Sequence, residues 1–404
     1  MGVALFMTVG TGRRTEESIK SLAHGILSAI THYNPDKIVF FGSDESKETI
    51  TSLKDQYYEE KRKKLADYEF ITVSGVDDFD ECFERMRRKI EEYEGYEIII
   101  DYTSGTKTMT MCAAICSMLY HKRLSLISGK RGKDGIVIPG TEKPGEQNLY
   151  SAYDKLQFDR VKDLFNSYRF EESRSTLNQI VILGEKETYE KMIDAYDQWD
   201  KFNHQAAFEI LKDISDSRVS QNKAFLGELV HKINLKYFII DLINNAARRI
   251  EEEKYDDAVA RLYRTVELVA QARLMDMDLI DKNRFKDNMA FVIRLDILKE
   301  RLDDEVVNKH CNGQKDDDLK RGIIKLSLYK SYALLHDLND DLGVKFDEDD
   351  TLQTLLQSRN SSILAHGLRS VEKDVAERLF EKVIEYAGIA LLDELVGKAA
   401  FPRL

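Results

Sequence analysis

Short apolar runs alternate with amphipathic stretches along the first 140 residues. The runs consist mainly of Val, Ile and Phe, and continuous apolar strands of this kind are typical of a parallel sheet that helices cover on both faces. The sequence therefore predicts a doubly wound α/β domain. Its strands are expected at VALFMTV (3–9), KIVFF (37–41), YEFITV (68–73), YEIIID (96–101), RLSLIS (123–128) and GIVIPG (135–140), and its helices near 16–32, 45–66, 77–94 and 106–120.

The last two apolar runs are joined by GKRGKDG (129–135), which has the glycines of a turn. A turn of this kind between two short strands favours a hairpin at the edge of the sheet. The sheet is therefore expected to be mostly parallel, with one antiparallel pair.

From residue 150 onward the spacing of apolar residues is helical almost throughout, with no proline between Pro144 and Pro402. Aromatic anchors at Phe170, Phe202 and Tyr255 mark three loosely similar segments. Their unequal spacing indicates stacked helical hairpins and not a solenoid. The expected fold class is α/β plus all-α, with a Rossmann-like domain over 1–145, a helical linker region over 146–230 and a C-terminal helical bundle over 231–404.

The composition of the 404-residue chain is that of an ordinary soluble protein, with 43% hydrophobic and 33% charged residues. No apolar run approaches the ~20 residues that cross a bilayer. The opening MGVALFMTVG lacks the basic leader of a signal peptide. We therefore expect a cytoplasmic protein with no membrane partner.

Charge narrows the range of nucleic-acid contacts. The net charge is −12; residues 1–140 hold 20 Lys and Arg against 22 Asp and Glu, and the remaining residues hold 40 against 50. Nonspecific affinity for nucleic acid comes from neutralising phosphates, so this chain is not built to hold long nucleic acid by charge alone. Any contact with nucleic acid is expected to be local or transient.

The four cysteines do not follow a zinc-binding pattern. Cys112 and Cys116 lie one helical turn apart in an apolar segment, while Cys82 and Cys311 are isolated. Because no second pair of ligands at zinc spacing accompanies them, buried small hydrophobic side chains are the better interpretation. No metal site is expected.

Two loops at strand ends are rich in glycine and hydroxyl residues. They are TVGTGRRTEES after the first strand and DYTSGTKTMT after the YEIIID strand. Ligands of open α/β sheets bind beyond the carboxyl ends of the strands. Gly105 allows close backbone approach, and Lys107 lies in the first turn of a helix whose N–H groups favour an anion. Together the two loops predict a site for a phosphate-containing ligand. The alternative is that each loop is only a capped turn from strand to helix.

Neither loop matches a familiar nucleotide fingerprint. GTGRRT lacks the third glycine of the dinucleotide motif, and TSGTKT lacks the spacing of the nucleoside-triphosphatase loop. The sequence therefore does not predict ATP hydrolysis.

The segment RNSSILAHG (359–367) interrupts an apolar helical pattern with polar side chains. If one helix runs through 359–366, Arg359 and His366 lie nearly two turns apart on one face, which Ser362 shares. Taken alone, a structural histidine near a helix end is the better interpretation, because Gly367 is a natural stop and a cation is favoured there.

The pair TVGTG and DYTSGTKTM resembles the CARF sensor domain of CRISPR-associated type III ancillary ribonucleases, over about the first 140 residues. The resemblance implies a homodimer that binds a cyclic oligoadenylate second messenger across its two-fold axis. The messenger would be the functional link to a type III CRISPR effector complex, and some family members also cleave it slowly. The implied contacts to the ring come from Thr8, Gly10, Thr11, Gly12, Thr103, Ser104, Gly105, Thr106 and Lys107.

The segment RNSSILAHG resembles the Arg–Asn–x5–His signature of HEPN ribonucleases, and RLYRTVELVAQARL (261–274) is similar to an early helix of that fold. This resemblance implies a dimer in which the Arg and His residues of both chains line one cleft. The dimer would cut single-stranded RNA there, as part of antiviral defence. No cofactor or metal is implied. The RNA's own 2′-hydroxyl attacks the adjacent phosphate and leaves 2′,3′-cyclic phosphate and 5′-hydroxyl ends.

The residue types suit that chemistry. Histidine titrates near neutrality, so His366 is the candidate for moving a proton. Arg359 keeps its charge and offers a planar fork of donors that matches phosphate oxygens. Asn360 would either orient His366 or hold a phosphate oxygen.

Two other function classes stay open. One is a non-catalytic sensor whose helical half binds a protein or a promoter, and it predicts oligoadenylate binding without RNA cleavage. The lack of a basic recognition helix counts against its DNA-binding version. The other is a metabolic nucleotide enzyme on the α/β domain, which a copurifying cofactor would reveal.

Overall fold

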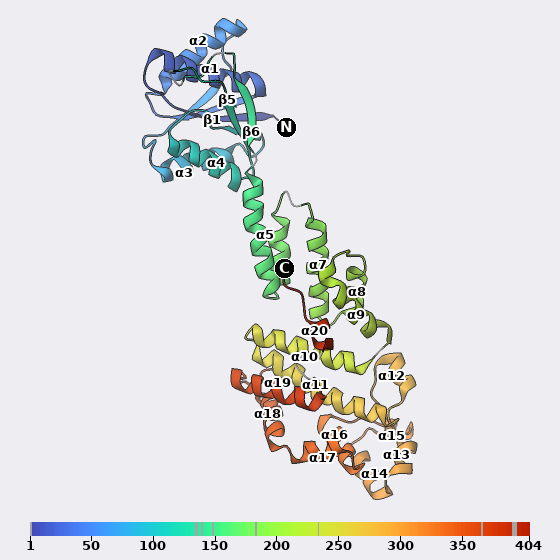
Figure 1. Cartoon of the computed structure of the whole chain (residues 1–404). Coiled ribbons are helices and arrows are strands. Elements are labelled where there is room, and N and C mark those ends of the chain that lie inside the picture. The colour runs from blue at the N-terminus through green and yellow to red at the C-terminus, as the bar shows by residue number, and fades with distance from the viewer. Residues whose placement is uncertain are drawn as a thin grey trace. The chain divides into compact units, whose positions relative to one another are not determined.

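The computed structural model in Figure 1 describes residues 2–133, 136–138, 140–147, 149–181, 184–232, 234–364, 367–389 and 394–404, with residues 286–288 and 361 described by their backbone only. The chain divides into two compact units. They are residues 1–157 with 180–183, and residues 158–179 with 184–404. Across the described residues, no helix is long and apolar enough to span a membrane.

The first unit is an α/β domain in which strands and helices alternate along the chain. Its elements are β1 (Val3–Val9), α1 (Glu16–Tyr33), β2 (Lys37–Gly42), α2 (Lys47–Lys61), β3 (Tyr68–Thr72), α3 (Phe79–Glu92), β4 (Glu97–Asp101), α4 (Lys107–Leu119), β5 (Arg123–Ser128) and β6 (Lys143–Gln147). They form one sheet in the order β3-β2-β1-β4-β5-β6. Strands β1 to β5 are parallel and β6 is antiparallel, which confirms the predicted doubly wound, mostly parallel sheet.

Helices cover both faces of this sheet because successive side chains of its strands are apolar on both sides. Along β1, Phe6 lies in a core with Met86 of α3, whereas Leu5 lies in a second core with Ile26 of α1. Figure 1 shows the two helix pairs, α1 with α2 and α3 with α4, on opposite sides of the strands.

The prediction for the cysteines is confirmed for the three in the first unit. Cys82, Cys112 and Cys116 are buried in the core that includes Phe6. Burial raises the pKa of Cys112 and of Cys116 to about 12, so both stay as neutral thiols. Cys311 is half-buried.

The edge of the sheet differs from the prediction. The antiparallel partner of β5 is β6, a segment that the pattern predicts as loop, with Leu126 opposite Gly145. The expected partner, 135–140, includes residues outside the described ones. Within it, Ile138 N–H donates to Lys130 C=O at 2.8 Å, and Val137 forms an isolated antiparallel bridge with Arg131. The described residues of this segment therefore pair with those just after β5, but they are not the strand that pairs with β5 itself. Pro144 argues against a strand in a sequence pattern, but an edge strand tolerates proline.

The second unit is helical, as predicted, and shares α5 with the first. Its elements are α5 (Tyr150–Asn166), α6 (Phe170–Asn178), α7 (Lys186–Asp200), α8 (His204–Leu211), a 3-10 turn (Ser217–Val219), α9 (Ser220–Lys232), α10 (Leu235–Glu251), α11 (Tyr255–Asp276), α12 (Lys282–Asn288), β7 (Ile293–Arg294), α13 (Leu295–Arg301), α14 (Asp304–Cys311), α15 (Asp316–Lys320), β8 (Ile323–Ile324), α16 (Leu328–Asp337), α17 (Asp341–Glu348), α18 (Asp350–Ser361), α19 (Lys373–Ala387) and α20 (Glu394–Ala399). The boundaries expected near 145 and 230 stay predictions.

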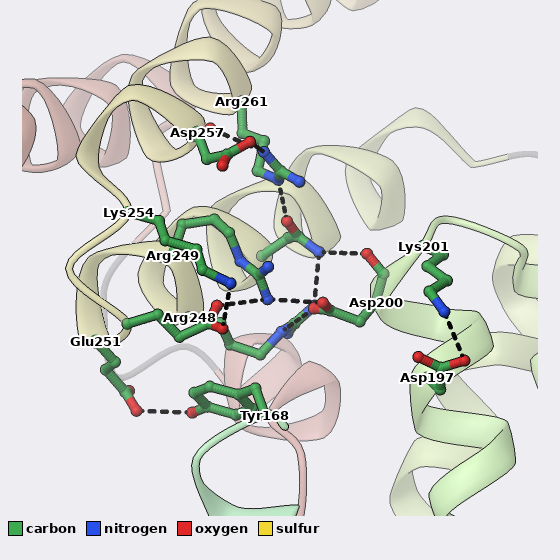
Figure 2. A network of polar contacts seen from close by, with 12 residues as sticks. Tyr168, Asp197, Asp200, Lys201, Arg248, Arg249, Glu251, Lys254, Asp257 and Arg261 are labelled. Atoms are coloured by element: carbon green, nitrogen blue, oxygen red, sulfur yellow. Dashed lines mark hydrogen bonds and ion pairs between the residues drawn. The ribbon is translucent and has the colours of Figure 1, made fainter. Parts of the chain in front are cut away.

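A buried polar network joins α7, α10 and α11 (Figure 2). Asp200, the last residue of α7, accepts hydrogen bonds from Arg248 Nε at 2.9 Å and from Arg249 Nη2 at 2.6 Å. Asn245 of α10 donates to the main-chain and side-chain oxygens of Asp200 at 3.1 and 3.2 Å, and it accepts from Arg261 Nε on α11. Arg248 and Arg249 are only 4% and 8% exposed, so the carboxylate balances charge that water scarcely reaches.

The segment that follows α20 packs against the same helices. The ring of Phe401 lies 4.8 Å from that of Tyr196 and 5.1 Å from that of Trp199, and the guanidinium of Arg248 lies 3.8 Å from the Phe401 centroid. Asn222 Nδ2 donates to the carbonyl of Lys398 in the last turn of α20 at 2.8 Å and to that of Ala400, just after α20, at 2.9 Å. Apolar and polar contacts thus hold α7, α9 and α10 together.

Replacing Asp200 by Ala is expected to lower the free energy of unfolding of the helical unit by about 3–5 kcal/mol, because the buried guanidinium of Arg248 loses its counter-charge and that of Arg249 keeps only Glu252. The chain has one tryptophan, the buried Trp199, so its fluorescence during urea unfolding of the full chain measures this change. Glu187→Ala on the same helix is the control, since Glu187 is 80% exposed, and it should leave the transition in place. Equal effects of the two variants would contradict the role given to Asp200.

Candidate functional site

The two glycine-rich loops meet at the centre of the sheet. Strands β1 and β4 are parallel neighbours, and the strand order reverses between them. The loops that follow these strands therefore leave the sheet at the same edge, at the position where open α/β sheets bind ligands. The two loops singled out in the sequence are thereby brought together.

Backbone contact between the loops requires glycine in both. Gly10 N–H donates to Ser104 Oγ at 2.9 Å, and the Thr8 hydroxyl donates to the Ser104 carbonyl oxygen. A Cβ on Gly10 would lie 3.1 Å from the nitrogen of Gly105. Gly105 has a φ of +112°, and a Cβ there would lie 3.0 Å from the Cβ of Thr8. Only residues without a side chain allow this approach.

The hydroxyl groups of the second loop shape the protein itself. Thr103 Oγ1 accepts from Ile127 N–H at 2.7 Å. Thr106 Oγ1 donates to the Val76 carbonyl at 2.6 Å and accepts from a main-chain N–H in the first turn of α4 at 3.2 Å. Contacts from these hydroxyls to a ligand stay a prediction. The exposed Lys107 and the N–H groups that begin α4 are the groups best placed for an anion.

Asp101, the last residue of β4, is a buried residue that fixes the second loop and that sequence reasoning missed. Its carboxylate accepts from Thr103 N–H at 3.1 Å and from Ser125 Oγ at 2.7 Å. Burial raises the pKa of Asp101, because the charged form is poorly solvated there. The sequence signal that could have identified it is an acidic residue at the end of an apolar strand, directly before a loop rich in glycine and threonine.

The first loop turns sharply before α1. Gly12 has a φ of +54° and is exposed, and a Cβ there would collide with the Ser18 hydroxyl. Arg14 N–H donates to the Thr11 carbonyl at 3.2 Å, and Arg13 N–H donates to Ser18 Oγ at 3.1 Å. Arg13 and Arg14 are exposed, so this loop presents cationic side chains.

In the second unit, the helix expected through 359–366 is shorter than predicted. Helix α18 starts at the N-cap Asp349, whose carboxylate accepts from Leu352 N–H at 2.9 Å, and ends at Ser361. Ser362 is extended, with φ −81° and ψ 160°, and it is buried. The argument that places Arg359, Ser362 and His366 on one helical face is therefore wrong.

Arg359 lies in the last turn of α18 and is half-buried. Its guanidinium carbon lies 4.8 Å from the ring centroid of Tyr263 on α11. Arg359 Nε is buried and has no hydrogen-bond partner among the described residues. Asn360 is exposed. His366 lies outside the described residues, so its meeting with Arg359 stays a prediction.

The segment on either side of residues 365–366 is anchored to the unit. Gly367 N–H donates to the Ser362 carbonyl at 3.1 Å, and Ser362 forms a bridge with Arg369. Val371 N–H donates to the carboxylate of Asp256 on α11 at 3.2 Å. The first two contacts join the two ends of the segment to each other, and the third ties its C-terminal end to α11.

Three apolar side chains in this segment face solvent. Ile363, Leu364 and Leu368 are 67%, 47% and 94% exposed. A helical continuation of α18 would have placed some of them against the core, which explains why the apolar pattern suggested a longer helix. Within the described residues, no group of three or more His, Cys, Asp or Glu is arranged to hold a metal ion.

A family model described as Csm6 HEPN domain matches residues 228–390, and one described as Csm6 6H domain matches residues 153–240. The chain belongs to the Csm6 family. It is a type III CRISPR ancillary ribonuclease with a HEPN domain, as the sequence resemblance implied. In this Csm6 family member, α18 and the RNSSILAHG segment fall inside the HEPN match, and the Asp200 network lies near the overlap of the two matches.

Solved structures extend the likeness to the whole chain. Enterococcus italicus Csm6 bound to cyclic hexa-2′-fluoro-hexa-dAMP is 12% identical, with a TM-score of 0.65, and the match covers 98% of this chain and 97% of that one. It confirms the fold, a CARF sheet followed by HEPN helices. Can2 from Sulfobacillus thermosulfidooxidans in complex with cyclic tetra-adenylate is 11% identical over 51% of this chain and 68% of that one, with a TM-score of only 0.26. No curated protein matches the chain in sequence.

Gly105→Ala is expected to destabilise the sheet unit by about 1–3 kcal/mol, because a side chain is forced into a left-handed conformation against Thr8. Calorimetry of the full chain measures the loss, and hydrogen exchange should rise in both loops. Gly95→Ala is the matched control, since a Cβ there meets nothing within 4 Å and should not speed exchange. If Gly105→Ala behaves like Gly95→Ala, the loops do not depend on this close approach.

Proposed function

We propose that this Csm6 family member is a metal-independent endoribonuclease that cuts single-stranded RNA and is switched on by a cyclic oligoadenylate. The observation that carries the proposal is the state of Arg359, which lies in the last turn of α18 inside the matched HEPN region. Arg359 is half-buried and has no acidic partner among the ion pairs of the described residues. An arginine left in this state keeps its positive charge for an incoming phosphate.

The proposed reaction uses the substrate's own nucleophile. A ribose 2′-hydroxyl loses its proton and attacks the adjacent phosphorus, and the bond to the 5′-oxygen of the next nucleotide breaks. The products are a 2′,3′-cyclic phosphate and a 5′-hydroxyl. His366 moves the proton, and Arg359 stabilises the negative charge that builds up on the phosphate oxygens. Asn360 either orients His366 or holds a phosphate oxygen.

A second copy of the chain is the proposed partner at the cleft. Ile363 and Leu364 lie inside the RNSSILAHG motif and Leu368 directly follows it. All three are exposed, and apolar side chains gathered on a surface favour a protein interface. A two-fold interface here brings two Arg359 and His366 sets to one cleft. The resulting homodimer acts in the cytoplasm and is linked to the CRISPR effector complex only through the messenger.

The proposed activator site is the pair of loops after β1 and β4. Their contact at Gly10 and Gly105 leaves the start of α4 open, with Lys107 exposed there. An oligoadenylate ring presents phosphates to such N–H groups and cations. Enterococcus italicus Csm6, which has the same fold, was solved with a cyclic molecule of six nucleotides, so a cyclic hexa-adenylate is the first candidate. Activation requires that the ring bind the cleaving state more tightly than the resting state.

The decisive assay is cleavage of a labelled single-stranded RNA by the full chain, with cyclic tetra-adenylate, cyclic hexa-adenylate or neither. We expect cleavage to rise with one of the rings, to persist in EDTA, and to fall about 100-fold or more in His366→Ala and Arg359→Ala. His336→Ala and Arg378→Ala are controls, since their side chains are 48% and 55% exposed in the same unit. Mass spectrometry of the same samples measures any cleavage of the activator.

Loss of activity in EDTA, or normal cleavage by His366→Ala, would refute the proposed mechanism. Binding of a ring without any RNA cleavage would favour the non-catalytic sensor instead.

Lys107→Ala is expected to raise the activator concentration for half-maximal cleavage about tenfold, because one charge-assisted contact to a phosphate is lost. The rate at saturating activator should be kept. Lys122→Ala, which removes a lysine after α4 and away from the loops, is the control. An unchanged activation curve in Lys107→Ala would remove this residue from the activator site.

A further inference from the structure

Tyr263 is the aromatic side chain on which Arg359 rests. It lies on α11, inside RLYRTVELVAQARL, almost 100 residues before Arg359 in the sequence. The guanidinium carbon of Arg359 lies 4.8 Å from the centre of its ring. A cation this close to an aromatic ring is attracted by the negative charge of the ring face.

Two arginines that flank Tyr263 on α11 are held in a different way. Arg261 pairs with Asp257 at 3.0 Å, and Arg264 pairs with Glu267 at 2.9 Å, both on α11. A carboxylate partner fixes a guanidinium but also neutralises it and occupies its donors. Among the described residues Arg359 forms no ion pair and its Nε has no hydrogen-bond partner, so its guanidinium lies against the Tyr263 ring without a counter-charge there.

An aromatic ring suits an arginine that must bind phosphate. It covers one face of the guanidinium plane and leaves the donors along the edge free for oxygens. It adds no negative charge, since burial raises the pKa of Tyr263 and keeps the phenol neutral at physiological pH. Arginine has many rotamers, and a contact that restricts them places the charge before the substrate arrives.

We propose that Tyr263 is a positioning residue for the RNA-cleaving reaction: its ring holds the guanidinium of Arg359 in place without neutralising it. This inference rests on the proposed function, in which Arg359 contacts the scissile phosphate. Neither the HEPN signature nor the sequence spacing assigns a role to Tyr263.

The test compares Tyr263→Leu, which removes the ring, with Tyr263→Phe, which keeps it and removes the hydroxyl. Cleavage of single-stranded RNA by the full chain is measured at saturating activator. We expect Tyr263→Leu to lower kcat about tenfold, which corresponds to about 1.4 kcal/mol, and to change KM less than about twofold. Tyr263→Phe should keep kcat within about twofold of the unmodified protein. A loss in Tyr263→Phe equal to that in Tyr263→Leu would overturn the inference.

A double-substitution cycle separates positioning from general loss of structure. If Tyr263 acts through Arg359, adding Tyr263→Leu to Arg359→Ala should cause no further loss of the residual rate. Independent losses that multiply would show that Tyr263 acts elsewhere. Should Tyr263→Leu fail to fold, Tyr263→Met takes its place, because methionine also lacks a ring and its flexible side chain fills irregular gaps in a core.

Phe291→Leu is the matched control. The ring of Phe291 lies 5.7 Å from the guanidinium of Arg264, which follows Tyr263 on α11, so this variant removes a similar contact from a different arginine. We expect kcat to be unchanged. Normal cleavage by Arg359→Ala would refute the proposed function itself, whereas an inactive Arg359→Ala with a fully active Tyr263→Leu would refute only the role of Tyr263.

Discussion

The carboxylate of Asp200 is the interaction on which the helical unit depends. It accepts hydrogen bonds from Arg248 and Arg249, and Asn245 extends the contact to Arg261 on α11. Hydrogen-bonded charge pairs are directional, so they fix the relative positions of α7, α10 and α11 more narrowly than apolar packing does. Because α11 also carries Tyr263, the network that joins the helices helps to determine where Arg359 is held.

The sheet unit depends on a steric constraint instead. The loops after β1 and β4 touch backbone to backbone at Gly10 and Gly105, and Asp101 fixes the turn that follows β4. The strands could be predicted within a residue or two, because buried parallel strands are continuous apolar runs. The glycine-rich loops could be predicted for the same kind of local reason. Strand β6 could not, since KPGEQ carries no apolar residue and pairs only because β5 offers a free edge.

The RNSSILAHG segment (359–367) shows where the local sequence pattern predicts the wrong structure. Ile363 and Leu364 continue the apolar spacing of α18, so the sequence favours a helix through His366. In the structure Ser362 leaves the helix and bridges to Arg369, and both apolar side chains face solvent. Such an ending is decided by contacts across the fold. The same holds for Tyr263. It lies close to Arg359 because two helices that are far apart in the sequence pack together, and the spacing of residues in the motif does not predict this contact.

Buried and half-buried arginines of this chain have two kinds of surroundings. Arg248 and Arg249 are buried and compensated by Asp200, which is how a protein stabilises charge that has no other task. Arg359 is half-buried, lies against a neutral ring and has no carboxylate partner in the described part of the chain. In the proposed function, a guanidinium without an acid is a binding group kept available for an anion. Under the proposed function, the singly charged phosphodiester of the RNA supplies the missing negative charge when substrate binds, and further charge develops on its oxygens in the transition state.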